Sequence, residues 1–169
     1  RIGKATGLRG KGFNMKVLYW GPNKMTPEDE KECGFEYVEF DELFRQSDFV
    51  SVHAAERPET KHLISDREFK LMKKSAYIVN SARGPIIDEK AMVRALQAKE
   101  IAGAGLDVYE NEPQIEKELF EMDNVVLAPH LGSAGKDVRE GMAQRVVDNI
   151  EALIDGKTPP NCANPETLK

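Results

Sequence analysis

The 169-residue chain has only two cysteines, Cys33 and Cys162, and a single tryptophan. Neither cysteine has neighbours with metal-ligand spacing, so we expect no structural zinc site and no metal. Thiols this sparse are typical of a reducing compartment, which predicts a cytoplasmic location. Both thiols are expected to be inert, because no histidine or group of cations adjoins them in the sequence.

Long hydrophobic runs and an excess of positive charge are also lacking. The longest apolar stretches, such as 124–128, have the length of a strand, whereas a membrane-spanning helix needs about 18 or more apolar residues. The 24 lysines and arginines stand against 29 aspartates and glutamates, which gives a formal net charge of −5. The sequence has no run of lysines and arginines that would attract the phosphates of a nucleic acid. We therefore expect neither a membrane nor a nucleic acid as partner.

What the chain does contain is a regular alternation of short apolar runs and amphipathic segments. Hydrophobic residues make up 40% and charged residues 31% of the sequence, as in an ordinary globular domain. We predict strands at 15–20, 35–40, 48–53, 75–81, 101–108 and 124–128, and helices at 2–12, 27–33, 41–46, 66–73, 89–99 and 133–155. Parallel strands need helix-sized connections, so this order predicts an α/β fold with a doubly wound parallel sheet.

Three of these helices carry clear start signals. Thr26 precedes Pro27 and a run of acids, which is typical of an N-cap followed by a first helical turn. Ser65 and Glu68 have the spacing of a capping box. Asp88 is placed to cap the helix that follows it.

Several polar residues follow predicted strands, at the edge where parallel sheets bind ligands. His53, Arg83, Asp107 and His130 each lie at or just beyond the carboxyl end of a predicted strand, and Glu112 lies five residues beyond Asp107. An arginine, two acids and a histidine at one edge indicate an acid/base site, because a carboxylate can orient an imidazole and raise its pKa. For His53 alone, a hydrogen bond to the backbone is the favoured interpretation.

Three segments share the pattern of one enzyme family. They are Asn-Ser-Ala-Arg-Gly at 80–84, Gly-x-Gly-Leu-Asp-Val-Tyr-x-x-Glu-Pro at 103–113, with Glu112 before Pro113, and Pro-His-Leu-Gly-Ser-Ala at 129–134. In order and spacing they resemble the D-isomer-specific 2-hydroxyacid dehydrogenases. The segments 11–15 and 71–74 and the Pro159-Pro160 pair resemble the glyoxylate/hydroxypyruvate reductase branch, with phosphoglycerate dehydrogenase as the nearest rival.

The resemblance implies a Rossmann-like NAD(P)-binding domain and hydride transfer between NAD(P)H and a small 2-oxo acid. His130 would donate the proton to the carbonyl oxygen, and Glu112 would hold the imidazolium. Arg83 would bind the substrate carboxylate, for which a planar, permanently charged group is suited. Asp107 would accept from the nicotinamide carboxamide. The implied cofactor-binding residues are Arg1, Ile2, Gly21, Asn23, Lys24, Ser81, Ala82, Arg83, Asp107, His130, Gly132 and Ser133.

The sequence departs from the family pattern in the cofactor region. Only the last three positions of the G-x-G-x-x-G fingerprint are present, as Arg1-Ile2-Gly3, and the strand before them is absent. We expect a gap in the sheet at that point. Gly21 stands where an acid usually binds the ribose, followed by Asn23 and Lys24, so either NADP or NAD is a credible cofactor. Residues 54–57, Ala-Ala-Glu-Arg, also differ from the family.

These patterns predict residues 1–156 as an N-terminally incomplete NAD(P)-binding domain and residues 157–169 as a tail leading toward an absent substrate domain. The family also implies a homodimer. Two other interpretations are retained, namely a non-catalytic dinucleotide-binding or dimerisation module and an inactive fragment. Activity with 2-oxo acids would distinguish an enzyme from both.

Overall fold

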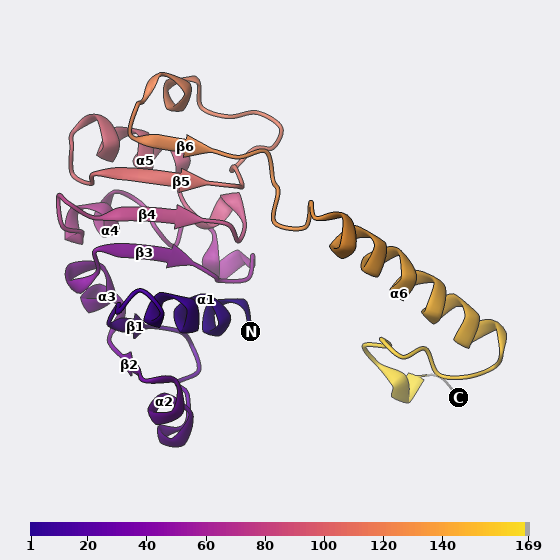
Figure 1. The fold of residues 1–169 in the computed structure, drawn as a ribbon. Helices are drawn as coiled ribbons and strands as arrows, with labels where there is room; N and C mark the ends of the chain where they lie inside the picture. The colour runs from indigo at the N-terminus through magenta and orange to yellow at the C-terminus, as the bar shows by residue number, and fades with distance from the viewer. Residues whose placement is uncertain (168–169) are drawn as a thin grey trace. The chain divides into compact units, whose positions relative to one another are not determined.

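The computed structural model describes residues 1–167 in two compact units. The first runs from Arg1 to Pro129 and contains every strand, and the second begins at His130. The elements follow in the order α1 Ile2–Lys11, β1 Val17–Tyr19, α2 Pro27–Cys33, β2 Phe35–Tyr37, α3 Phe40–Gln46, β3 Phe49–Val52, η1 Pro58–Thr60, α4 Asp66–Leu71, β4 Tyr77–Asn80, η2 Gly84–Ile86, α5 Glu89–Gln97, β5 Gly103–Leu106, η3 Lys117–Glu121, β6 Val125–Leu127, α6 Lys136–Ile154 and η4 Pro165–Thr167 (Figure 1).

The larger sheet has four parallel strands in the order β3-β4-β5-β6 (Figure 1). Val50 pairs with Ile78, Ile78 with Ala104 and Ala104 with Val125, so one row of apolar residues crosses the sheet. Each connection between neighbouring strands passes through a helix or 3-10 turn. The predicted parallel, doubly wound α/β fold is confirmed.

The two remaining strands form a separate parallel pair. In it, Val17 lies opposite Phe35 and Tyr19 opposite Tyr37. A cavity of about 1010 Å³ is lined by residues of both β1 and β3, which are the strands on either side of the division. The gap that the sequence predicts in the sheet lies between these two strands.

Helices α4 and α5 lie behind the four-stranded sheet in Figure 1 and form the main core with it. Phe69, Ile78, Ile86 and Met92 are completely or almost completely buried there. This burial follows from the sequence pattern, because alternate residues of β3 and β4 are buried and the intervening ones are exposed. The core therefore forms on one face of the sheet.

Helix α1 lies on the opposite side of the sheet in Figure 1, where it contacts the two-stranded part. A Cβ atom at Gly7 would lie 2.6 Å from the ring of Phe35 and 3.1 Å from a methyl group of Val17. Real Cβ atoms essentially never come as close as 2.6 Å to another heavy atom, so glycine lets the helix approach β1 and β2 closely. This close packing explains a glycine that helix propensity alone disfavours.

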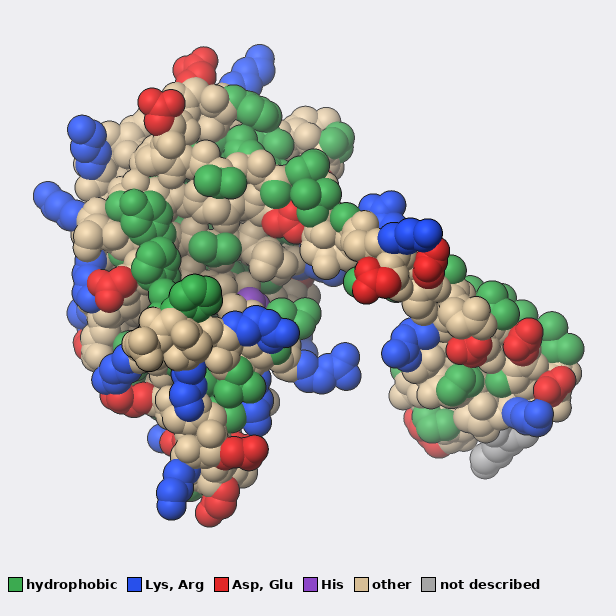
Figure 2. Space-filling view, in the orientation of Figure 1, with side chains coloured by type: hydrophobic (Ala, Val, Ile, Leu, Met, Phe, Trp, Pro, Cys, Tyr) green, Lys and Arg blue, Asp and Glu red, His purple; other side chains and the backbone are tan. Residues whose placement is uncertain are grey.

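The same side of the four-stranded sheet carries exposed apolar side chains. Phe49 and Tyr77 stack with ring centroids 5.6 Å apart, and Val79 and Val126 are exposed beside them. Figure 2 shows apolar side chains scattered over this visible face of the unit.

The three predicted helix starts are present. The Thr26 hydroxyl accepts a hydrogen bond from Asp29 N at 3.1 Å, and the Asp88 carboxylate accepts one from Ala91 N at 3.0 Å. The Glu68 carboxylate accepts one from Ser65 N at 3.0 Å, as a capping box requires. These caps satisfy backbone groups that the first helical turn leaves without partners.

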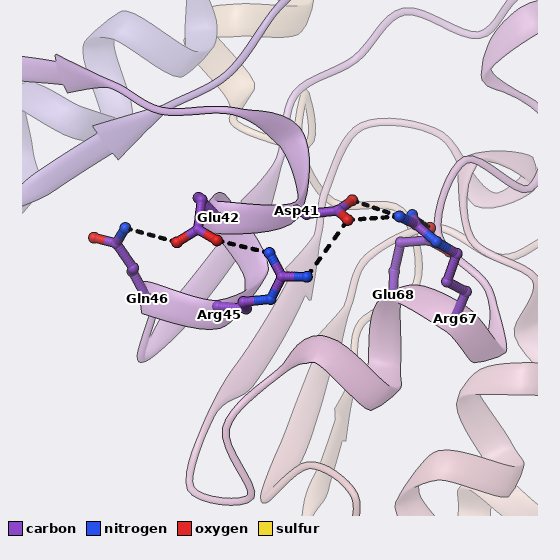
Figure 3. A network of polar contacts seen from close by, with 6 residues as sticks. All are labelled: Asp41, Glu42, Arg45, Gln46, Arg67 and Glu68. Atoms are coloured by element: carbon purple, nitrogen blue, oxygen red, sulfur yellow. Dashed lines mark hydrogen bonds and ion pairs between the residues drawn. The ribbon is translucent and has the colours of Figure 1, made fainter.

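A network of six polar side chains joins α3 to α4 (Figure 3). Both oxygens of Asp41 accept from Arg67, at 2.8 and 2.6 Å, and Arg67 also donates to Glu68 at 2.8 Å. Arg45 bonds Glu42 at 2.6 Å and lies 3.6 Å from Asp41. Most of these groups are exposed, so the individual pairs contribute little to the stability of the fold.

The second unit, which begins at His130, contains the 19-residue helix α6 and the segments before and after it. The apolar residues Met142, Val146, Ile150 and Leu153 recur at helical spacing and are exposed. The chain after the helix folds back, because Asn161 N donates to the Asn149 side chain at 3.0 Å. In the described part of the chain, no helix combines the length and apolarity needed to cross a membrane.

Candidate active site

A cavity of about 830 Å³ opens at the carboxyl ends of β3 and β4. Its lining combines the start of α1, the segment after β3 and the turn after β4: Ile2, His53, Ala54, Ala55, Glu56, Arg57, Pro58, Lys61, Ser81, Ala82, Arg83 and Pro85. Four of the predicted site residues, Ile2, Ser81, Ala82 and Arg83, therefore share one cavity. Three cations and one carboxylate line it, so it is suited to an anionic ligand.

The turn that presents Arg83 is held by a buried side chain. Asn80, at the end of β4, is only 1% exposed. Its amide group donates to the Arg83 carbonyl at 2.9 Å and accepts from Ala82 N at 3.0 Å. A buried amide that satisfies two backbone groups of one turn fixes the shape of that turn. Our sequence reasoning gave Asn80 no role, although a polar residue at a buried strand position was a usable signal.

The Arg83 turn also packs directly against the segment after β5. A Cβ atom at Gly84 would lie 1.8 Å from the carbonyl oxygen of Tyr109, so only glycine fits there. On the same segment, Tyr109 N donates to the Glu112 carboxylate at 3.1 Å, and the Tyr109 hydroxyl donates to the Ala128 carbonyl at 2.8 Å. Asp107 N donates to the Asn80 carbonyl at 2.9 Å. Two strand ends thus present Arg83, Asp107 and Glu112 from neighbouring backbone segments.

His53 is half-buried at the end of β3 and lines the cavity. Its Nε2 lies 2.9 Å from the Ser51 hydroxyl, so the observed partner is a side chain and not the backbone that the sequence favoured. Ser51 and His53 are two residues apart and therefore lie on the same face of the extended chain. Burial lowers the pKa of His53, because desolvation disfavours the charged imidazolium.

The predicted cofactor-selecting residues follow β1. Gly21 lines the cavity between β1 and β3, and the Lys24 ammonium lies 4.7 Å from the centroid of the Tyr37 ring. Tyr19 holds this loop, since its hydroxyl accepts from Met25 N at 2.8 Å and donates to Glu30 at 2.6 Å. Burial and the hydrogen bond to Glu30 raise the pKa of Tyr19. Asn23 belongs to the same loop.

His130, Gly132 and Ser133 belong to the second unit and precede α6. His130 has a backbone φ of +55°, a left-handed conformation that is uncommon for a residue other than glycine. Such conformations persist where the surrounding structure determines them and are frequent at functional sites. The remaining predicted residue, Arg1, is the N-cap of α1.

The cavity suits a dinucleotide in two respects. The first turn of the ten-residue helix α1 reaches it through Ile2, and a helix N-terminus favours the negative charge of a pyrophosphate. Ala54, Ala55, Ser81 and Ala82 are small, so backbone groups can approach a ligand closely. Within residues 1–167, no group of three or more histidines, cysteines or acids is arranged to hold a metal ion.

Residues 1–132 match the family model described as "D-isomer specific 2-hydroxyacid dehydrogenase, NAD binding domain". The chain is 48% identical over 168 residues to a glyoxylate reductase of Thermococcus litoralis, covering 99% of this chain and 50% of that protein. It is 49% identical to a glyoxylate reductase of Thermococcus onnurineus, again covering 99% and 50%. The chain thus spans about half the length of these relatives.

Solved structures show the same similarity. A glyoxylate reductase from "Paecilomyes thermophila" superposes with a TM-score of 0.80 at 43% identity, over 86% of this chain and 44% of that one. The NAD complex of a D-isomer specific 2-hydroxyacid dehydrogenase from Lactobacillus delbrueckii ssp. bulgaricus gives a TM-score of 0.86 at 31% identity, over 96% and 53%. The chain belongs to the D-isomer specific 2-hydroxyacid dehydrogenase family and contains its NAD-binding domain.

Proposed function

We propose that the protein reduces a small 2-oxo acid, of the glyoxylate or hydroxypyruvate type, with NADH or NADPH. The observation that carries this proposal is the shared cavity, in which Arg83 lies with Ser81 and Ala82 beside the N-terminus of α1. A dinucleotide and a carboxylate can both be bound there by groups of suitable charge. The glyoxylate reductases among the relatives support the substrate class.

A nicotinamide dinucleotide held in this cavity would supply the hydride that reduces the carbonyl carbon of the 2-oxo acid. Arg83 holds the substrate carboxylate and polarises the carbonyl group. His130 gives a proton to the carbonyl oxygen, so that the product is a 2-hydroxy acid. Glu112 stabilises the imidazolium before transfer, and Asp107 accepts from the nicotinamide carboxamide.

The choice between NADPH and NADH is assigned to the loop after β1. Gly21 presents no carboxylate that would repel a 2′-phosphate, and Lys24 supplies a positive charge beside Tyr37. We therefore propose that NADPH is accepted as well as NADH. A homodimer and a cytoplasmic location belong to the same proposal and follow from the family and from the two free cysteines.

The test is an absorbance assay of NADPH and NADH oxidation by the full-length protein, with glyoxylate, hydroxypyruvate and phosphohydroxypyruvate. We expect turnover of the first two. His130→Gln should lower kcat by about 100-fold or more, because a positioned proton donor contributes that much, while cofactor binding is retained. Asp148→Asn, on exposed α6, is the control.

The outcomes separate the alternatives. Turnover retained in His130→Gln contradicts the role of this residue. Preference for the phosphorylated substrate indicates a phosphoglycerate dehydrogenase-type enzyme. Cofactor binding without turnover of any 2-oxo acid indicates a non-catalytic module and contradicts the proposed activity.

A further inference from the structure

Two glutamates hold each other's backbones in a reciprocal arrangement that we name the Glu89–Glu110 clamp. Glu89, the first residue of α5, is only 6% exposed. Its carboxylate accepts from Glu110 N at 3.0 Å and from Glu116 N at 2.8 Å. The Glu110 carboxylate accepts from Glu89 N at 3.2 Å, and its other oxygen lies 2.6 Å from His62 Nε2.

The clamp brackets the predicted acid of the active site. The two backbone N–H groups that donate to the Glu89 carboxylate, those of residues 110 and 116, lie on either side of Glu112 in the sequence. Tyr109 N, directly before the clamp, donates to the Glu112 carboxylate. The Tyr109 carbonyl in turn packs against Gly84, next to Arg83. The segment 109–116 is therefore held at both ends and along the backbone that faces the Arg83 turn.

A buried carboxylate is costly unless hydrogen bonds satisfy it, and two neighbouring carboxylates also repel each other. Bonds between a carboxylate and backbone N–H groups are charge-assisted and restrict geometry more strongly than neutral ones. An apolar side chain in place of Glu89 could fill the same space, but it could not accept from residues on both sides of Glu112. The arrangement is suited to holding one loop conformation.

We propose that Glu89 is a positioning residue for Glu112. It keeps the segment 109–116, and with it the Glu112 carboxylate, in one conformation beside the Arg83 turn. This inference rests on the proposed function for the roles of Glu112 and His130, whereas the clamp itself stands on the hydrogen-bond distances. Glu110 completes the arrangement, with His62 against its second oxygen.

Glu68 provides a matched comparison within the same unit. It is 7% exposed, lies in the first turn of α4 and accepts a backbone hydrogen bond from Ser65 N. Its other bond is to Arg67, and both Ser65 and Arg67 lie outside the segment 109–116. Glu68→Gln therefore alters a buried helix-start carboxylate without touching the loop that carries Glu112.

The experiment compares Glu89→Gln with Glu68→Gln in the full-length protein. In Glu89→Gln we expect amide hydrogen exchange to accelerate at least tenfold at Glu110 and Glu116, because both donors lose the carboxylate. We expect kcat to fall about tenfold with KM for the 2-oxo acid within twofold, and the alkaline limb of the kcat profile to move to lower pH. Glu68→Gln should show none of these three changes.

A double-variant test identifies the route of the effect. If Glu89 acts through Glu112, adding Glu89→Gln to Glu112→Gln should not lower kcat further. An additional tenfold loss, or an unshifted pH profile in Glu89→Gln, overturns the positioning role. Should Glu89→Gln fold poorly, Glu110→Gln removes the other, partly exposed half of the clamp; the amide of Glu89, which donates to the Glu110 carboxylate, must then exchange faster, with the same changes in kcat and in its pH profile.

Failure of the inference differs from failure of the proposed function. Exchange needs no turnover, so unchanged exchange at 110 and 116 overturns the clamp whatever the activity. If Glu112→Gln keeps the wild-type kcat, the proposed role of Glu112 is contradicted, and so is the positioning role of Glu89, which depends on it. Faster exchange confined to 109–116 would still support the clamp as a structural device.

Discussion

The four-stranded and two-stranded parts of the sheet differ in how firmly they are packed. The main core cluster lies between Phe44 and Leu119 and includes residues of β3, β4 and β5. In the two-stranded part, all three residues of β1 are only partly buried, and in β2 Phe35 alone is buried. Arg83, proposed to bind the substrate, and Glu112, proposed to stabilise the imidazolium, follow β4 and β5, which are strands of the firmly packed part.

This contrast matches two different demands. Groups that act on a reacting carbonyl must be held precisely, which rigid elements and a surrounding shell of hydrogen bonds achieve. In the proposed function, the loop after β1, with Gly21 and Lys24, would meet only the sugar or phosphate at the far end of the cofactor. Changes in that loop would then alter which cofactor is preferred rather than the chemistry. The four predictions below test this division, beginning with the largest effect.

Phe69→Ala should be the most destabilising change. The Phe69 side chain is completely buried in the main core, and truncation of a buried phenylalanine costs about 3–5 kcal/mol. Phe35→Ala, in β2, should cost roughly half as much, because fewer core residues surround it. Urea unfolding of both variants measures the difference. Equal losses would mean that the two parts of the sheet are packed equally firmly.

Gly84→Ala should destabilise by about 3 kcal/mol, since the new methyl group must push the Tyr109 backbone away. It should also abolish turnover, because Arg83 and Glu112 lie on the two segments that separate. Gly105→Ala is the matched control, since its Cβ would meet Val79 only at 3.8 Å. Unfolding curves and the 2-oxo acid assay test both variants. Normal turnover in Gly84→Ala would contradict the close packing of these segments.

Lys24→Ala should lower the ratio of kcat/KM for NADPH to that for NADH about tenfold. The lost attraction between a partly exposed ammonium and a 2′-phosphate is worth about 1.4 kcal/mol. Gly21→Asp should shift the ratio in the same direction through repulsion. Neither change should affect the pH dependence of kcat. An unchanged ratio in both variants would remove the loop after β1 from cofactor selection.

The smallest expected effect concerns pH and His53. Because burial lowers the pKa of His53 below its ordinary value of 6.5, the unfolded chain binds this proton more readily than the folded one. The contribution of neutral His53 to the free energy of unfolding is therefore fully present above pH 6.5 and is lost as the pH falls toward the lowered pKa. His53→Gln should flatten this decline between about pH 7 and pH 5 in urea unfolding curves. An identical slope in the two proteins would contradict the shift.

Much of the fold followed from local signals in the sequence. The caps at Thr26 and Asp88 and the Ser65–Glu68 spacing each determine a helix start within a few residues, because they satisfy the same backbone groups in any context. Strand ends were less certain. The run predicted as 48–53 is a strand only at Phe49–Val52, since pairing with β4 and not apolar character decides where it stops.

The site was predictable only in part. His53 and Arg83, two of the strand-end residues, line one cavity, because carboxyl ends of parallel strands meet at one edge. Glu89 was missed. An acid in the first turn of a helix is ordinarily exposed and interacts with the helix dipole, and nothing local distinguishes one whose partners lie 21 and 27 residues further along the chain.

In the four-stranded sheet, spatial order equals chain order. During synthesis, β4, β5 and β6 each emerge after the strand that precedes them in the sheet. Strand β4 can therefore pair with β3 before β5 exists. No strand has to be inserted between two others. Each pairing step therefore closes a single crossover connection and costs only the entropy of that one loop. We expect this half of the first unit to assemble progressively from its N-terminal side, with β6 as the last strand to join.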